Sequence, residues 1–133
     1  MAARIPEKFR DLLTTKKAFA HLATVSKDCE PHSTPVWVDA EGDFILVNSA
    51  KGRLKDRHMR QNERVALSII DPDDPYRHLA VRGRVAEITE KGADAHINAM
   101  AQKYLEVDTY PHRQPGEVRV IYKIEPESVS TME

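Results

Sequence analysis

Apolar positions along the chain follow the periods of a short helix, six strands and two longer helices. Residues 5–13 carry apolar side chains at helical spacing behind a proline, which predicts a short leading helix. A longer helix is expected after Gly52 as far as about Asn62, and another from Thr89 to Leu105. The six predicted strands have continuous or alternating apolar residues and cover residues 18–25, 32–38, 44–47, 65–70, 78–88 and 118–124.

The order of these elements predicts the fold class. Most strands follow one another as hairpins, and the helices are inserted between them, which favours an antiparallel barrel over a parallel doubly wound sheet. At 133 residues, the whole of 1–133 is expected to be one domain. Pro35 cannot donate to a strand ladder, so its strand should lie at an edge or carry a bulge. We therefore expect a mainly β protein with inserted helices.

Three segments are predicted as turns or loops. Residues 26–30 should form a hairpin turn, although Cys29 stands where glycine would be more comfortable. Residues 40–43 should return the chain into the strand that begins at Phe44. Residues 71–76 contain two prolines and three aspartates, which is typical of a solvated loop rather than a calcium site.

Composition narrows the classes of function. Charged residues make up 31% of the chain but the net charge is −1, so bulk charge favours neither nucleic acid nor a membrane surface as partner. The N-terminus lacks the apolar segment of a signal peptide, and no run is long enough to span a bilayer. The lone Cys29 fits a reducing cytoplasm. Six histidines without paired spacing give no indication of a metal site.

The stretch from Phe44 to Arg57 carries the clearest indication of chemistry. A buried strand leads through Asn48, Ser49 and Gly52 into a basic helix. Donors at a helix N-terminus attract anions, and Arg53 and Lys55 add full charges. The stretch is either a phosphate seat or an ordinary loop before a solvated helix.

Self-contained catalytic patterns are missing. The chain has no G-x-S-x-G, no phosphate-binding P-loop and no G-x-G-x-x-G sequence, and the only cysteine has no evident histidine partner. No catalytic residue is assigned. The basic residues between Lys51 and Arg60 could form a nucleic-acid stripe, but aromatic residues are not interleaved with them. What remains is a small barrel that binds an anionic cofactor, with the cofactor supplying the chemistry.

Seven segments in order carry a resemblance that covers nearly the whole chain. They are HLATV from His21, PHSTPVW from Pro31, NSAKGRLK from Asn48, NERVALS from Asn62, DPDDPYR from Asp71, VRGRV from Val81 and PGEVRV from Pro115. The chain resembles the pyridoxamine 5′-phosphate oxidase-like superfamily, in particular the small oxidoreductases that use the deazaflavin coenzyme F-420. The resemblance implies a six-stranded antiparallel split β-barrel and a homodimer with cofactor sites at the interface.

The resemblance also implies roles for individual residues. Pro35, Val36 and Trp37 would lie against the cofactor ring, although a lone tryptophan is also a common core residue. Asn48 and Ser49 would lie near the ring or the phosphate, and Arg53 and Lys55 would bind the phosphate. Residues of the partner subunit would approach the same site, namely Tyr76, Arg77 and His78.

The sequence is compatible with several functions. The favoured one is hydride transfer between reduced coenzyme F-420 and a small unsaturated or carbonyl acceptor, in the cytoplasm. The alternatives are an FMN-dependent oxidoreductase of the same fold, a non-catalytic cofactor carrier and a nucleic-acid-binding barrel. A longer anionic tail on the deazaflavin would favour additional basic groups, which Lys51, Arg57 and Arg60 could supply. Neither a nucleic acid nor a membrane is the expected partner.

Overall fold

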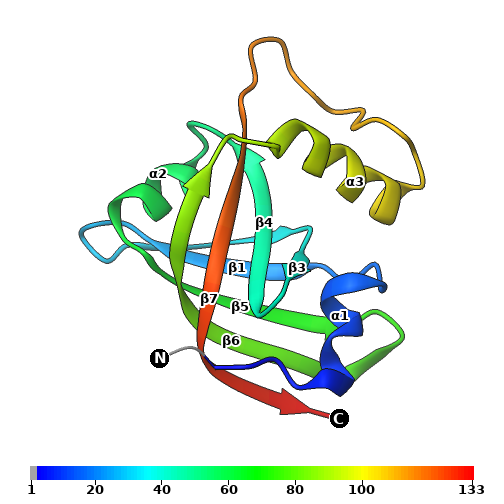
Figure 1. Ribbon diagram of the computed structural model, residues 1–133. Helices are drawn as coiled ribbons and strands as arrows, with labels where there is room; N and C mark the ends of the chain where they lie inside the picture. Colours follow the sequence, from blue (N-terminus) through cyan, green and yellow to red (C-terminus); the bar gives the residue numbers. More distant parts are fainter. Residues whose placement is uncertain (1–2) are drawn as a thin grey trace.

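The computed structural model describes residues 3–133, which form a mainly β fold with three α-helices and one 3-10 turn (Figure 1). The helical elements are η1 (Glu7–Phe9), α1 (Asp11–Thr14), α2 (Leu54–Gln61) and α3 (Ala93–Leu105). The strands are β1 (Ala20–Val25), β2 (Pro31–Val36), β3 (Asp39–Glu41), β4 (Phe44–Ala50), β5 (Arg64–Asp71), β6 (Asp74–Thr89) and β7 (Arg119–Met132).

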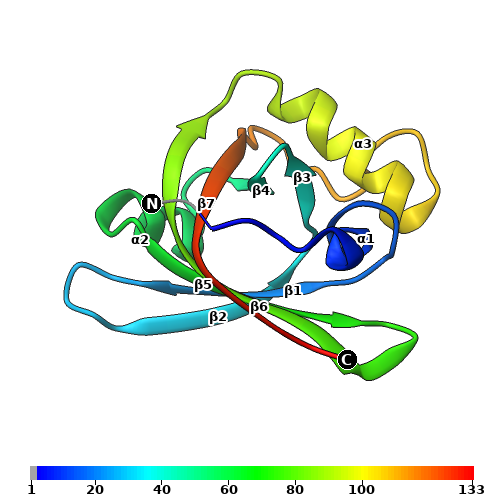
Figure 2. The same cartoon turned by 60° about the horizontal axis from the view of Figure 1, so that its bottom comes forward.

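These seven strands of residues 3–133 form one antiparallel sheet in the order β2-β1-β5-β6-β7-β4-β3. The sheet curls around its core, as Figure 2 shows, but β2 and β3 remain as unpaired edges. The antiparallel, mainly β prediction is confirmed. The count of six strands is wrong and the sheet is not a closed barrel. The missed strand is β3, whose three residues pair with β4 but are too few to show an alternating pattern.

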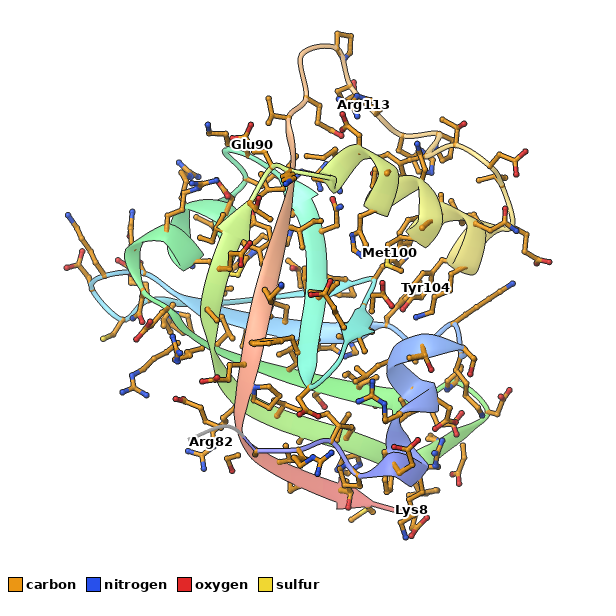
Figure 3. The ribbon with its side chains drawn as sticks, in the orientation of Figure 1. Lys8, Arg82, Glu90, Met100, Tyr104 and Arg113 are labelled. Carbon is orange, nitrogen blue, oxygen red and sulfur yellow. The ribbon has the colours of Figure 1, made fainter. Side chains whose placement is uncertain are left out.

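The main core lies inside the curled sheet and is closed by the leading helical segment. Phe9, Leu12 and Leu13 are almost fully buried there, so the apolar spacing of this segment correctly predicted its inward face. The helix itself is interrupted, since η1 and α1 are separate elements. A smaller cluster consists of Ile97, Met100 and Tyr104 of α3, and Figure 3 shows Met100 and Tyr104 on the side of α3 that faces the sheet.

Two predicted boundaries are wrong because strand pairing extends further than the local sequence indicates. Residues 71–76 are not a loop: Asp71 of β5 pairs with Asp74 of β6, and the turn between them has two residues. Thr89 does not open α3 but ends β6, where it pairs with Ile121 of β7. Helix α3 begins instead at Ala93.

Two local predictions are confirmed. The strand that holds Pro35 is the edge strand β2. Cys29 has a φ of 66°, the left-handed conformation in which glycine is unstrained.

Pairing between strands that are distant in the sequence forms the surface on which the candidate site lies. In the β4–β7 ladder, Ala50 is opposite Arg119 and Ser49 is opposite Val120. Helix α3 lies beside the upper ends of both strands (Figure 1), and the loop after it returns to the start of β7. Residues distant in sequence therefore surround the junction between β4 and α2.

Candidate functional site

A pocket of about 230 Å³ lies where β2, β4, the start of α2 and α3 meet. One part of its wall is apolar or aromatic and consists of Phe19, Pro35, Val36, Trp37, Ile97 and Tyr110. The other part is polar or basic and consists of Asn48, Ser49, Arg53, Lys55, His112 and Arg119. The structure thus brings seven of the ten sequence-predicted site residues to one pocket.

Three cations converge at the polar end of this pocket. The pKa of Lys55 lies below its ordinary value because the side chain is buried and because Arg53 and Arg119 repel its charge. Within residues 3–133, one carboxylate pairs with these cations: Glu117, whose oxygens lie 3.0 Å from Nη1 of Arg119 and 3.5 Å from Nη2 of Arg53. The pocket therefore holds an excess of positive charge, which an anion would balance.

Among the residues that the structure describes, the hydroxyl of Ser49 has no hydrogen-bond partner in this basic environment. Ser49 is 2% exposed and lines the pocket, yet its Oγ makes no hydrogen bond with any described residue. Buried polar atoms nearly always have a partner. A serine hydroxyl can donate to an anionic oxygen, so Ser49, Arg53, Lys55 and Arg119 together have the donors of an anion seat.

The N-terminus of α2 supplies fewer donors than the sequence suggests. Arg53 occupies the N-cap position, and Gly52 has a φ of 96°, which suits glycine. The N–H of Gly52, expected to face an anion, instead donates to Oδ2 of Asp56 at 2.9 Å. The buried Asp56 carboxylate also accepts from Arg60 and from the Tyr122 hydroxyl. Side chains, more than this backbone donor, therefore define the seat.

Trp37 is part of the pocket wall and of the packing beneath α3. Its ring is stacked on Tyr104 with centroids 5.0 Å apart, and it meets Tyr110 edge-to-face at 6.0 Å. Tyr104 is fixed in turn, because its hydroxyl donates to the carbonyl of Ala18 at 2.6 Å and accepts from the N–H of Val38 at 3.1 Å. Burial raises the pKa of Tyr104 to about 12. Trp37 therefore packs between Tyr104, which hydrogen bonds hold in place, and Tyr110 of the pocket wall.

Three predicted site residues lie outside this pocket. Tyr76 is 76% exposed on β6. The guanidinium of Arg77 pairs with Asp11 at 2.7 Å and Asp71 at 2.8 Å, a cluster within its own chain. His78 follows on the same strand and does not line the pocket. Their expected approach to a site on the partner subunit stays a prediction.

Five residues of the pocket were not predicted from the sequence, namely Phe19, Ile97, Tyr110, His112 and Arg119. The sequence does contain one signal for Arg119: this arginine lies between Val118 and Val120 and interrupts an otherwise apolar strand. The structure buries it to 3% exposure. Its Nε donates to Oδ1 of Asn48 at 3.0 Å, across 71 positions of sequence.

Two kinds of feature do not occur in residues 3–133. The histidine, cysteine and acidic side chains of this range nowhere gather in threes as a metal site would need. None of its helices has the length and apolar character needed to cross a membrane.

Similar folds occur in solved structures. A protein described as an F-420 reductase is 33% identical to this chain, with 95% of this chain and 98% of that one covered and a TM-score of 0.80. A putative pyridoxamine 5′-phosphate oxidase from Listeria innocua is 21% identical, over 94% of this chain and 95% of that one, with a TM-score of 0.70. The conserved hypothetical protein Rv2991 from Mycobacterium tuberculosis is 20% identical, over 99% and 86%, with a TM-score of 0.76.

Curated protein sequences give no match to this chain. The family model for pyridoxamine 5′-phosphate oxidase, however, matches residues 5–133, which is almost the full length. This match includes every described strand and helix and all the residues that line the pocket. The chain belongs to the pyridoxamine 5′-phosphate oxidase family.

Proposed function

We propose that this chain is an oxidoreductase that binds coenzyme F-420 through the anion seat and passes a hydride to a small unsaturated or carbonyl acceptor. Family membership and the 33% identical F-420 reductase support the oxidoreductase class. The observation that carries the proposal is the hydroxyl of Ser49, which lies among three cations and has no hydrogen-bond partner within residues 3–133. FMN is the alternative cofactor, because its phosphate would satisfy the same donors.

The residues of the pocket fit a ligand with an anionic end and a flat apolar end. Arg53, Lys55 and Arg119 would each offer a charge-assisted hydrogen bond to phosphate, about 1.5–3 kcal/mol apiece. Ser49 would add a neutral donor. Pro35, Val36 and Trp37 form an apolar wall beside the basic end, where a ring system could lie and exclude water.

The bound cofactor supplies the hydride, so the protein has to bind, orient and desolvate. The packing of Trp37 against Tyr104 and Tyr110 suits this task, since a well-packed wall helps to orient a ring that lies against it. No single proton donor is assigned: no carboxyl group lines the pocket, and Lys55, Tyr110 and His112 each carry a group that can donate a proton.

Additional basic groups for a longer cofactor tail are partly engaged elsewhere. Lys51 lies 3.3 Å from Glu90, and Arg60 lies 3.0 Å from Asp56. Arg57 lines a different depression of the surface, next to the β1–β2 hairpin. The two ion pairs also weaken the nucleic-acid alternative, because they neutralise two of the five lysine and arginine residues between Lys51 and Arg60.

A homodimer would enlarge the site. Ligand pockets usually have volumes of ~300–1,000 Å³, and the pocket of one chain has about 230 Å³. A second copy would supply the remaining wall, and Tyr76, 76% exposed, is available to take part. Sedimentation should show a dimer at micromolar concentration. A monomer that still binds the cofactor would exclude a site shared between subunits.

Titration of the purified protein with F-420 and with FMN tests the proposal. Visible absorbance and quenching of Trp37 fluorescence would follow binding, since this tryptophan is the only one in the chain. Arg53→Ala should weaken affinity by roughly 10- to 150-fold, toward the lower figure because its side chain is 45% exposed. Arg82→Ala is the matched control, since Arg82 lies on β6 away from the pocket (Figure 3).

The outcomes separate the alternatives. Binding of F-420 followed by hydride transfer to an unsaturated acceptor supports the proposal, while binding without turnover favours the carrier. Preference for FMN would identify the alternative enzyme. If neither cofactor quenches Trp37, the seat is an ordinary basic loop.

A further inference from the structure

A chain of hydrogen bonds leads from the edge strand β3 to the anion seat. Asp39 of β3 lies 3.1 Å from Nε2 of His96 on α3. Nδ1 of His96 lies 3.1 Å from Nδ2 of Asn48 on β4. Oδ1 of Asn48 accepts from Nε of Arg119 on β7 at 3.0 Å. Four elements of structure are therefore joined through side chains that end at one cation of the pocket.

The partners of Asn48 determine the direction of every bond in this chain. Its Nδ2 donates to the carbonyl of Ala93 at 3.0 Å, and its Oδ1 accepts from Arg119, so the amide has one orientation. The second hydrogen on Nδ2 then points to Nδ1 of His96, which must be the acceptor. The ring proton of neutral His96 is consequently on Nε2 and donates to Asp39.

Asp39 is suited to accept this proton as a carboxylate. Burial alone would raise its pKa, but the hydrogen bond from His96 and another from the backbone N–H of Ala40 hold the pKa of Asp39 below its ordinary value. A carboxylate that accepts from one ring nitrogen fixes the tautomer and the plane of a histidine, as in many metal and catalytic sites.

At the other end of this chain of hydrogen bonds, two of the three guanidinium nitrogens of Arg119 are hydrogen-bonded. Nε is taken by Asn48 and Nη1 by Glu117 at 3.0 Å, and the guanidinium lies 5.0 Å above the ring of Tyr110. Within residues 3–133, Nη2 has no hydrogen-bond partner. The side chain is 2% exposed and lines the pocket. Nη2 is thus the nitrogen that would donate a hydrogen bond to an anion in the seat.

We propose that Asp39 and His96 are positioning residues: they fix the amide of Asn48, which fixes the guanidinium of Arg119 against the anionic end of the cofactor. This inference rests on the proposed function, because it concerns the same seat. Neither Asp39 nor His96 lines the pocket, so both act through Asn48. Without the acceptor on His96, Nδ2 of Asn48 keeps only the carbonyl of Ala93 as acceptor, and the amide holds Arg119 less firmly.

A double-mutant cycle tests this coupling through cofactor affinity. His96→Leu should weaken binding of F-420 or FMN by about tenfold. This is the order expected if the hydrogen bond from Arg119 to the anion is largely lost, since that bond involves charged groups. In an Arg119→Ala background, His96→Leu should cause little further loss, because its effect passes through Arg119. In an Arg53→Ala background the full tenfold loss should remain. Equal losses in the two backgrounds would overturn the proposal.

A conservative variant separates positioning from folding. His96→Asn places an amide oxygen near the position of Nδ1, so it can still accept from Asn48 and should bind within about threefold of wild type by restoring one hydrogen bond. If both His96 variants bind equally weakly although folded, the acceptor at Nδ1 is not what matters. His96→Asn also keeps the test available if His96→Leu does not fold.

The tautomer of His96 gives a measurement that needs no cofactor. Long-range ¹H–¹⁵N spectra of the wild-type protein at neutral pH should show the proton on Nε2 and a bare Nδ1. A proton on Nδ1 would overturn the proposed chain even if the cofactor binds. Conversely, if the wild type shows the expected tautomer but binds neither cofactor, the proposed function has failed, and the positioning role toward a cofactor fails with it.

Discussion

Replacing Lys55 by methionine should stabilise the empty protein and weaken cofactor binding at the same time. Burial and the charges of Arg53 and Arg119 lower the pKa of Lys55, so its charged form is disfavoured in the folded state. This cost is fully present below the folded pKa, and it fades as pH rises toward the unfolded value. Methionine keeps much of the apolar stem and removes the charge.

The size of the gain in stability follows from this partial burial. We expect about 0.5–1 kcal/mol, the lower part of the range for optimised surface charge, since solvent screens a half-buried group. For a chain of this length, a gain of that size corresponds to a rise in Tm of roughly 2–5 °C. Thermal unfolding of the cofactor-free protein at pH 7 measures it.

Binding should change in the opposite direction. Loss of one charge-assisted hydrogen bond, about 1.5–3 kcal/mol, weakens cofactor affinity by roughly 10- to 150-fold. Isotherms for F-420 and FMN at two salt concentrations measure this, and the variant should show the weaker salt dependence, because one cation has been removed.

Lys91→Met is the matched control, since Lys91 is exposed and lies outside the pocket. Its stability should stay within about 0.5 kcal/mol of wild type, with unchanged affinity. If Lys55→Met lowers the Tm of the empty protein and leaves cofactor affinity unchanged, Lys55 is not part of an anion seat.

Three further predictions concern the scaffold. In Gly83→Ala, the new Cβ would overlap the carbonyl oxygen of Glu125, so chemical denaturation should show a loss of about 1–3 kcal/mol. An unchanged midpoint would contradict the close approach. Cys29→Gly should gain about 0.5–1 kcal/mol by relieving a positive φ, with turnover unchanged, and Cys29→Ala should show no such gain. Lys16 and other donors hold the pKa of Asp71 below its usual range, so the stabilisation is present above the unfolded pKa, near 4, and is lost as pH falls through the folded value. Asp71→Asn should therefore unfold more easily at neutral pH and show a flatter acid limb in stability-versus-pH curves, and parallel curves for both proteins would disprove this.

Local patterns in the sequence determined much of the fold because they report on residues that are neighbours in the chain. Alternating apolar residues marked most of the strands, since successive side chains of a strand point to opposite faces. Pro35 indicated an edge because it lacks an N–H, and β2 is an edge strand. The strain expected at Cys29 appears as its positive φ. Arg53 and Lys55 followed an apolar strand closely enough to be proposed as an anion seat, and both line the pocket.

Tertiary structure alone decided how distant segments meet. The short strand β3 exists because it pairs with β4, and β6 continues through Thr89 because β7 pairs with it. The same pairing of β4 with β7 brings Arg119 to Asn48 across 71 positions, where no period of the sequence could place it. Docking of α3 then sets His96 between Asn48 and Asp39. These contacts depend on the register between strands and on the seating of a helix, which are properties of the whole curled sheet and not of any local pattern.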